Sequence, residues 1–293
     1  MASCRLPVWL FDWSATGNRG TGHFLQDGNL LPATPPATSP DGIETYLAAA
    51  AKWLPVPAPL VAPDGQHYAY NESLGNPEID RVHVVEVASG ADRVVAQGTS
   101  DTGFEAIAFE TDGIYAGRPT QGPATNPGLW RLDPQTGKAG LIEASHRWSW
   151  ISHGFAYTVI PNPSDPVVVQ GGPQADTLLR LDLGSHAVSQ VLRKRGVPVR
   201  VRGFDSSGHP IVLLGSTAAD LYVLTDTNAA QPLGGSREHT FAFVQPSLVA
   251  APDGFWMGAD QGILRYSTGS GFQLAWTNPK VKTVLPLVAG ACA

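Results

Sequence analysis

The chain has 293 residues, of which 43% are hydrophobic and only 15% charged, and its net charge is −6. This composition is too apolar for a disordered protein, and the acidic balance argues against nucleic acid as a partner. The 32 glycines and 25 prolines separate short apolar runs, which is typical of all-β proteins. The chain contains no run of 18 apolar residues, the length that a membrane-spanning helix needs.

The N-terminal region contains three strand-like runs, VWLFDW, GHFLQ and LLPA, with an Asp-Gly turn between the last two. They predict three consecutive antiparallel strands. The first residues, MASCRLPVW, lack the basic start and apolar core of a secretory signal, so we expect no signal sequence in this chain. The triplet ASC at residues 2–4 resembles the end of a bacterial lipoprotein cleavage box, which leaves lipidation of Cys4 as one alternative.

The segment at residues 32–56 is longer than a connection between two strands requires. Their first half is rich in Pro, Thr and Ser and predicts a loop. Their second half, SPDGIETYLAAAAKW, offers Ser39 or Asp41 as a helix cap and good helix formers from Ile43 onward. We therefore expect a loop and a short helix inserted between two sheets, with a disordered linker as the alternative.

An apolar run followed by an Asp-Gly turn recurs along the rest of the chain. Residues 60–72, LVAPDGQHYAYNE, are nearly repeated at residues 248–260, LVAAPDGFWMGAD. The turn glycines are Gly65, Gly113, Gly154 in a poorer His-Gly turn, Gly208 and Gly254. They lie 48, 41, 54 and 46 residues apart, which gives a period of about 47 residues.

A second marker shares this period, namely an apolar strand that ends in Asp, Ser or Thr and a polar turn. Its copies are HVVEVASG (83–90), LWRLDPQTG (129–137), LLRLDLGS (178–185), LYVLTDTN (221–228) and ILRYSTGSG (263–271). Two markers with one period of 40 to 50 residues predict a β-propeller, in which each blade has four short strands. For the first unit the predicted strands are APLVA, QHYAYN, RVHVVEV and DRVVAQ. A two-sheet sandwich would explain the short strands but not the double marker.

This repeat, APDG followed by an apolar strand and then a DxxTG turn, resembles the TolB-type and WD-repeat-like propeller repeats of bacteria over residues 57–276. The resemblance implies a fold, and for TolB-like modules it implies non-catalytic binding of a protein or glycan outside the cytoplasm. Residues 251–267, APDGFWMGADQGILRYS, also look like a repeat of the streptogramin-lyase kind, and gluconolactonases share the six-bladed shape. A metal-dependent propeller enzyme of lactonase or streptogramin-lyase type is therefore the alternative, although no motif identifies catalytic residues or metal ligands. We predict no cofactor and leave open a divalent metal in the central channel.

Five repeat units cover the middle of the chain. The strands predicted at its two ends belong to none of these units. The C-terminal segment VKTVLPLVAGACA resembles an innermost strand whose blade then stops, whereas the three N-terminal strands lack an innermost strand. We therefore predict one all-β domain over residues 1–293, a six-bladed β-propeller whose sixth blade is closed by the C-terminal strand plus the N-terminal strands. We also expect a monomer.

The two cysteines, Cys4 and Cys292, fall at matching ends of this predicted blade. A disulfide between them would replace the tight turn that joins the equivalent strands of the other blades. It would also indicate an oxidising location, so that the protein is secreted, periplasmic or on the cell surface. The alternative is two unrelated thiols in a cytosolic protein.

Residues 145–154, SHRWSWISHG, have the most unusual local composition. In an extended strand His146, Trp148 and Trp150 would share one face. They could form an aromatic platform near the channel mouth. Alternatively, the aromatic rings fill the space between blades.

Basic residues concentrate in the propeller loops that would emerge on one face. Eleven of the 19 basic residues fall in these loops, and residues 193–202, RKRGVPVRVR, supply five of them. We predict a rim that binds a protein or an anionic glycan. The predicted ligand-binding residues are Arg118, His146, Arg147, Trp148, Trp150, Arg193, Arg195 and Arg237. Neutralisation by acidic residues of the same loops is the alternative.

Overall fold

The structure is a computed structural model that describes residues 4–12, 19–33, 38–39, 44–74, 79–99, 102–118, 128–164, 166–169, 172–215, 220–226, 229–234, 248–280 and 284–293. Nearly all regular structure in these ranges is β-strand. The helices among them are two single 3-10 turns, η1 (Ala48–Ala50) and η2 (Ala58–Leu60). No helix in these ranges is long and apolar enough to cross a membrane. The all-β prediction is confirmed.

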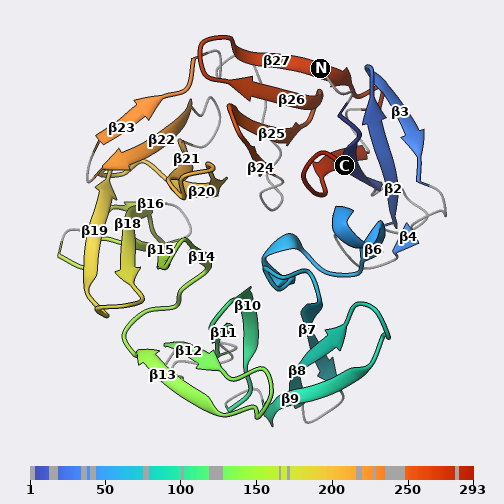
Figure 1. The fold of residues 1–293 in the computed structure, drawn as a ribbon. Coiled ribbons are helices and arrows are strands. Elements are labelled where there is room, and N and C mark those ends of the chain that lie inside the picture. Colours follow the sequence, from blue (N-terminus) through green and yellow to red (C-terminus); the bar gives the residue numbers. More distant parts are fainter. Residues whose placement is uncertain are drawn as a thin grey trace. The chain divides into compact units, whose positions relative to one another are not determined.

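The second to fifth repeat units each form a four-stranded antiparallel sheet (Figure 1). The strand orders are β10 (Glu105–Glu110), β11 (Gly113–Gly117), β12 (Leu129–Leu132), β13 (Ala139–Glu143); β14 (Trp150–Ser152), β15 (Phe155–Pro161), β18 (Ala175–Asp182), β19 (Val188–Arg193); β20 (Val199–Phe204), β21 (Pro210–Leu214), β22 (Asp220–Asp226), β23 (Ala229–Pro232); and β24 (Leu248–Ala251), β25 (Gly254–Ala259), β26 (Gly262–Ser267), β27 (Gly271–Thr277). A small hairpin, β16 (Val168–Val169) with β17 (Gly172–Pro173), is inserted between β15 and β18. In each sheet the predicted turn joins the first strand to the second, through Asp-Gly or His-Gly in three sheets and through Asp205-Ser-Ser-Gly208 between β20 and β21.

The second marker has a simple cause in hydrogen bonding. The Asp133 carboxylate accepts the backbone N–H groups of Gln135 and Thr136, both at 2.8 Å, and so closes the turn after β12. The following Gly137 has φ +72°, a left-handed conformation that favours glycine. Asp182 closes the turn after β18 in the same way, through Gly184 and Ser185. The Asp and Gly of the marker are therefore turn residues with defined backbone roles.

The first repeat unit departs from the prediction. Its sheet has three strands, β7 (His67–Leu74), β8 (Ile79–Glu86) and β9 (Asp92–Thr99). The predicted innermost strand APLVA is the 3-10 turn η2, followed by one bridge between Val61 and Tyr68. Pro57 and Pro59 have no N–H group to donate to a neighbouring strand, which explains why this segment cannot form a regular ladder.

The insertion at residues 32–56 also differs from the prediction. Instead of an α-helix, it has β4 (Thr38–Ser39) paired with β2, and the hairpin of β5 (Thr45–Leu47) and β6 (Lys52–Leu54) around η1. Residues 40–43, where the helix was expected to start, lie outside the described residues.

Aromatic packing explains why the alanine run stops at one helical turn. Tyr46 and Trp53 face each other across the hairpin, with ring centroids 5.3 Å apart. Trp53 also packs against Trp9 at 5.6 Å, and Tyr46 against Phe24 at 4.9 Å. Burying these rings outweighs the modest helix propensity of four alanines.

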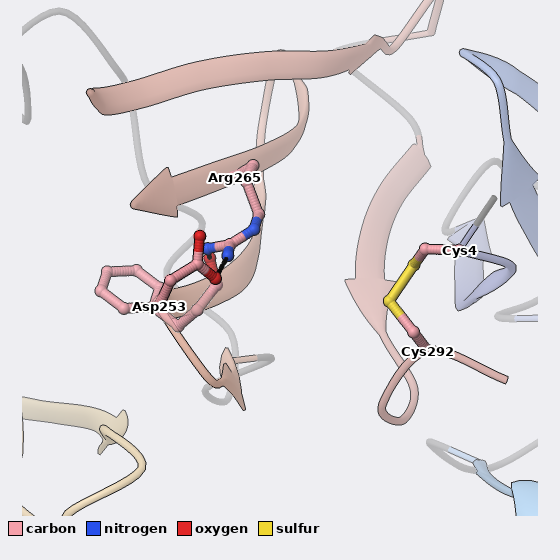
Figure 2. The surroundings of a disulfide bond; sticks show 5 residues. Cys4, Asp253, Arg265 and Cys292 are labelled. Atoms are coloured by element: carbon pink, nitrogen blue, oxygen red, sulfur yellow. Dashed lines mark hydrogen bonds and ion pairs between the residues drawn. A yellow bond between two sulfur atoms is a disulfide. The ribbon is translucent and has the colours of Figure 1, made fainter. Parts of the chain in front are cut away.

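The two chain ends form one sheet, in the order β28 (Val284–Val288), β1 (Leu6–Asp12), β2 (Arg19–Gln26), β3 (Asn29–Pro32). β28 pairs antiparallel with β1 from Val8↔Val288 to Asp12↔Val284. Figure 2 shows the disulfide between Cys4 and Cys292 beside this pairing; their Cα atoms are 5.2 Å apart. The predicted joining of the termini and the predicted disulfide are confirmed, and the Cys4 thiol is therefore not free to carry a lipid.

The chain divides into two compact units. The first comprises Met1–Pro55, Val159–Leu179 and Gln190–Ala293, and the second comprises Val56–Thr158 and Arg180–Ser189. The terminal sheet belongs to the first unit, where Leu6, Val8 and Val288 pack with Leu25 and Ile263 in one apolar cluster. The assignment of all 293 residues to one domain remains a prediction.

We expect replacement of both Cys4 and Cys292 by Ser to lower the free energy of unfolding. The bond closes a loop of 288 residues, and chain entropy gives about 5–6 kcal/mol as an upper figure for such a loop. Chemical denaturation of the wild type and the double variant, each with and without reductant, measures the loss. Reductant should weaken only the wild type. An equal response of both proteins, or two alkylated thiols in protein purified without reductant, would contradict the disulfide.

Candidate functional site

One carboxylate organises the start of the segment at residues 145–154. Glu143, the last residue of β13, accepts hydrogen bonds from the backbone N–H of Ser145 at 2.7 Å and of His146 at 3.2 Å, and from the indole N–H of Trp148 at 2.8 Å. These bonds fold residues 144–146 into a turn, and the strand begins only at Trp150. The expected extended strand through His146 and Trp148 is therefore wrong, because Glu143 binds the N–H groups that a strand would pair.

The two tryptophans differ in how far they are buried. Trp148 is 1% exposed, and the His146 ring meets it edge-on at 5.8 Å. Trp150 is half-buried. Trp148 thus fills the interior, in agreement with the packing alternative, and the only part of the predicted platform that reaches solvent is His146 with Trp150.

The predicted arginines of the second unit are engaged with neighbouring groups. Arg147 forms an ion pair with Glu105 at 3.1 Å, with both side chains about half exposed. Arg118 lies over the Trp130 ring at 4.7 Å and over Phe104 at 5.6 Å. The Arg147–Glu105 pair is exposed, and pairs of this kind contribute little to stability, whereas Arg118 is partly buried against its two aromatic rings.

The predicted basic run in the first unit is held by a buried carboxylate. Asp176 is 0% exposed, and its Oδ2 accepts the backbone N–H of Gly196 at 2.9 Å. Its carbonyl oxygen accepts the N–H of Lys194 at 3.0 Å, and Gly196 has φ +72°. Burial would raise the pKa of Asp176, but the hydrogen bonds from Gly196 and Thr177 outweigh it and lower that pKa. Asp176 therefore holds the backbone of the turn from its buried side, while the side chains of Lys194 and Arg195 are exposed.

The predicted site residues thus fall into two local groups. Arg118, His146, Arg147, Trp148 and Trp150 belong to the second unit, and Arg193 and Arg195 belong to the first. Arg237 lies outside the described residues. The single basic rim remains a prediction.

A polar network on β7, β8 and β9 was not predicted. His83 is 7% exposed, and its Nδ1 lies 3.0 Å from Asp92 Oδ1 while its Nε2 lies 3.2 Å from Glu72 Oε2. The Tyr70 ring stacks on the imidazole at 4.4 Å, and its hydroxyl donates to Asp92 Oδ2 at 2.7 Å. Arg81 donates to Glu72 at 3.3 Å.

Each member of this network has defined hydrogen-bond partners. Ionised carboxylates only accept hydrogen bonds, so both ring nitrogens of His83 must donate when both bonds are made. Burial would raise the pKa of Asp92, but the bonds from Tyr70 and His83 outweigh it and lower that pKa. Burial and the bond to Asp92 raise the pKa of Tyr70, which stays protonated. The bonds join β7, β8 and β9 through their side chains.

The register explains why the sequence did not reveal this network. Tyr70 pairs with His83, and Glu72 with Arg81, across β7 and β8, while Asp92 begins β9. Side chains of paired residues share one face of a sheet. The only signal was a histidine in the apolar run RVHVVEV.

A shallow pocket of about 310 Å³ borders this network and is lined by His67, Val84, Glu86, Ala91, Asp92 and Arg93. The Arg93 guanidinium also donates to the carbonyls of Pro134 and Gln135. The pocket carries both signs of charge and is open to solvent. Among the described residues, no group of three or more His, Cys, Asp or Glu side chains is placed to hold a metal ion.

We expect replacement of Glu143 by Gln to destabilise the protein by about 1–3 kcal/mol at neutral pH, because four donors, two of them on Ser145, lose a charged acceptor. Burial would raise the pKa of Glu143, but the hydrogen bonds from Ser145, Trp148 and His146 lower it overall. The stabilisation is therefore complete above the unfolded-state value of about 4.3 and is lost as the pH falls through the lower folded-state value.

Urea unfolding of the wild type and Glu143→Gln across this pH range tests the expectation. The two proteins should differ most at neutral pH and converge in acid. Glu105→Gln is the matched control, because its ion pair with Arg147 is half exposed; it should change the free energy of unfolding by less than about 1 kcal/mol. A constant difference at all pH values would contradict this role of Glu143.

No family model and no curated protein matches this sequence. Solved structures do match. TolB from Acinetobacter baumannii aligns with a TM-score of 0.53 and 16% identity over 98% of this chain and 65% of that one. The β-propeller domain of the Trilobed protease from Pyrococcus furiosus aligns with a TM-score of 0.52 and 11% identity over 93% of this chain and 83% of that one.

At these identities the likeness concerns the fold alone, and this chain spans only 65% of the TolB chain. The four-stranded antiparallel sheets and both matches agree on one architecture. The chain has the β-propeller fold, and its predicted resemblance to TolB-type propellers is confirmed at that level.

Proposed function

We propose that this chain is a six-bladed β-propeller that acts as a non-catalytic binding module and takes a protein or an anionic glycan on a basic rim. The blade number is supported by the repeat and by the sheet built from both termini. In this proposal the described sheets, together with the three-stranded one, belong to one monomeric domain that needs no cofactor.

The observation that carries the proposal is the turn at residues 193–197. A fully buried carboxylate, Asp176, holds this turn from below. Lys194 and Arg195 point outward from it, in a protein whose net charge is −6. Asp176 fixes the backbone that carries these cations, so the backbone loses little conformational freedom when an anion binds, which favours recognition.

The disulfide supports a location outside the cytoplasm. Bonds such as Cys4–Cys292 form and persist in oxidising compartments. We therefore propose that the protein is secreted, periplasmic or exposed on a cell surface.

We expect Lys194→Ala with Arg195→Ala to weaken binding of two anionic probes, a fluorescein-labelled oligoglutamate peptide and a heparin oligosaccharide, by about tenfold, which corresponds to about 1.4 kcal/mol. Binding by the wild type should weaken as salt is raised. Fluorescence anisotropy measures both effects. The matched control is Lys52→Ala with Lys138→Ala, which removes the same charge elsewhere and should change affinity by about twofold at most. Equal losses in the two double variants would contradict a defined site.

The same protein samples test the enzymatic alternative. A divalent metal bound in the central channel would raise the melting temperature by mass action. A rise with Ca²⁺ or Mg²⁺ that a chelator reverses would favour the metal-dependent enzyme over the binding module.

A further inference from the structure

The pocket that borders the polar network is built on one face of the sheet of β7, β8 and β9. His67 pairs with Glu86 across β7 and β8. Val84 pairs with Arg93 across β8 and β9. The Glu86 N–H donates to the Ala91 carbonyl at 2.9 Å, which places Ala91 opposite Glu86. Because paired residues share a face and alternate residues of a strand return to it, these five side chains point to the same side and line the pocket of about 310 Å³.

The remaining lining residue, Asp92, has its side chain on the opposite face of the sheet. The strand register places it there, and its carboxylate is held by the His83 imidazole and the Tyr70 hydroxyl. Its charge is therefore already used within the sheet. The permanent charges on the pocket's own face are those of Glu86 and Arg93.

Both of these charges are held in place by neighbouring groups. Glu86 Oε2 accepts the Ser89 hydroxyl. The Arg93 guanidinium donates to the carbonyls of Pro134 and Gln135 in the turn after β12. A carboxylate can accept about four hydrogen bonds and a guanidinium can donate about five, so both groups have capacity left for a ligand. Glu86 and Arg93 are diagonal neighbours across β8 and β9, and such neighbours lie about 7–8 Å apart in antiparallel pairs.

The floor of the pocket is apolar. Val84 is 2% exposed and lies on β8 between the two charged positions, and the short side chain of Ala91 leaves space beside Glu86. The pocket volume is near the lower end of the range of about 300–1,000 Å³ that is typical of ligand pockets. The pocket therefore suits a small ligand that carries one positive group, one negative group and a short apolar part.

We infer that this pocket binds a free α-amino acid with a short aliphatic side chain. Glu86 accepts hydrogen bonds from the ammonium group, Arg93 donates to the carboxylate, and the aliphatic side chain packs on Val84. A simple amine or a simple carboxylate would engage only one of the two charges. The inference goes beyond the proposed function, since the pocket belongs to the second unit and the basic turn to the first.

Three related ligands test the inference by isothermal titration calorimetry with the full chain. They are L-valine, N-acetyl-L-valine, which lacks the ammonium group, and L-valinamide, which lacks the carboxylate. L-Valine should bind, and each blocked derivative should bind at least about tenfold more weakly, because one of the two ionic contacts is lost.

Two single variants assign the contacts. Glu86→Gln keeps the size of the side chain and removes its charge, and it should weaken binding of L-valine by about tenfold. Arg93→Gln should have the same effect. The matched controls are Asp112→Asn and Arg131→Gln, which remove the same charges from a half-exposed ion pair of the same unit and should bind L-valine as the wild type does.

Melting curves show whether each variant folds, and if Arg93→Gln does not fold, Glu86→Gln and the three ligands decide the outcome. No binding of L-valine, equal binding of L-valine and its two derivatives, or unchanged binding by Glu86→Gln would overturn the inference. None of these results would affect the proposed function, which is measured with anionic probes on Lys194 and Arg195.

Discussion

The pairing of β28 with β1 is the constraint on which the first unit depends. The three N-terminal strands by themselves would leave the inner edge of β1 unpaired, and β28 alone would have no sheet. Their five paired positions join segments from opposite ends of the chain, and the Cys4–Cys292 bond fixes the ends next to this ladder. Leu6, Val8 and Val288 are then buried together in one core. Because no local sequence connects these strands, the stability of this sheet depends on long-range contacts.

A second interaction recurs in this structure, in which a side-chain carboxylate accepts hydrogen bonds from backbone N–H groups. Exposed Asp133 and Asp182 close turns between strands, and this explains the marker that repeats along the sequence. Buried Asp176 and partly buried Glu143 use the same chemistry at the segments with the most unusual composition. In one case the result is an outward-facing basic turn, and in the other a tryptophan held in the interior. The same local interaction therefore produces either a surface for binding or a packed core, depending on which side chains follow it.

Several expectations failed where tertiary packing or local hydrogen bonding opposed a sequence preference. The alanines from residue 48 onward form a single 3-10 turn because Tyr46 and Trp53 pack against Phe24 and Trp9. The segment APLVA is not a strand because Pro59 within it and Pro57 before it cannot donate to a ladder. A pattern of apolar residues indicates burial but does not indicate which backbone conformation achieves it.

The sequence by itself determined the all-β class, the positions of the repeated turns, the joining of the two ends and the pairing of the cysteines. These features depend on residues with one dominant physical role, namely Gly at positive φ, Asp at turns and two cysteines with no other partner. Only the tertiary structure decided that His83 lies between Glu72 and Asp92, that Trp148 is buried, and that Val167 lies against Gly196 of the basic turn. Those contacts depend on strand register and on the packing of an inserted hairpin, which arise from interactions between residues far apart in the chain.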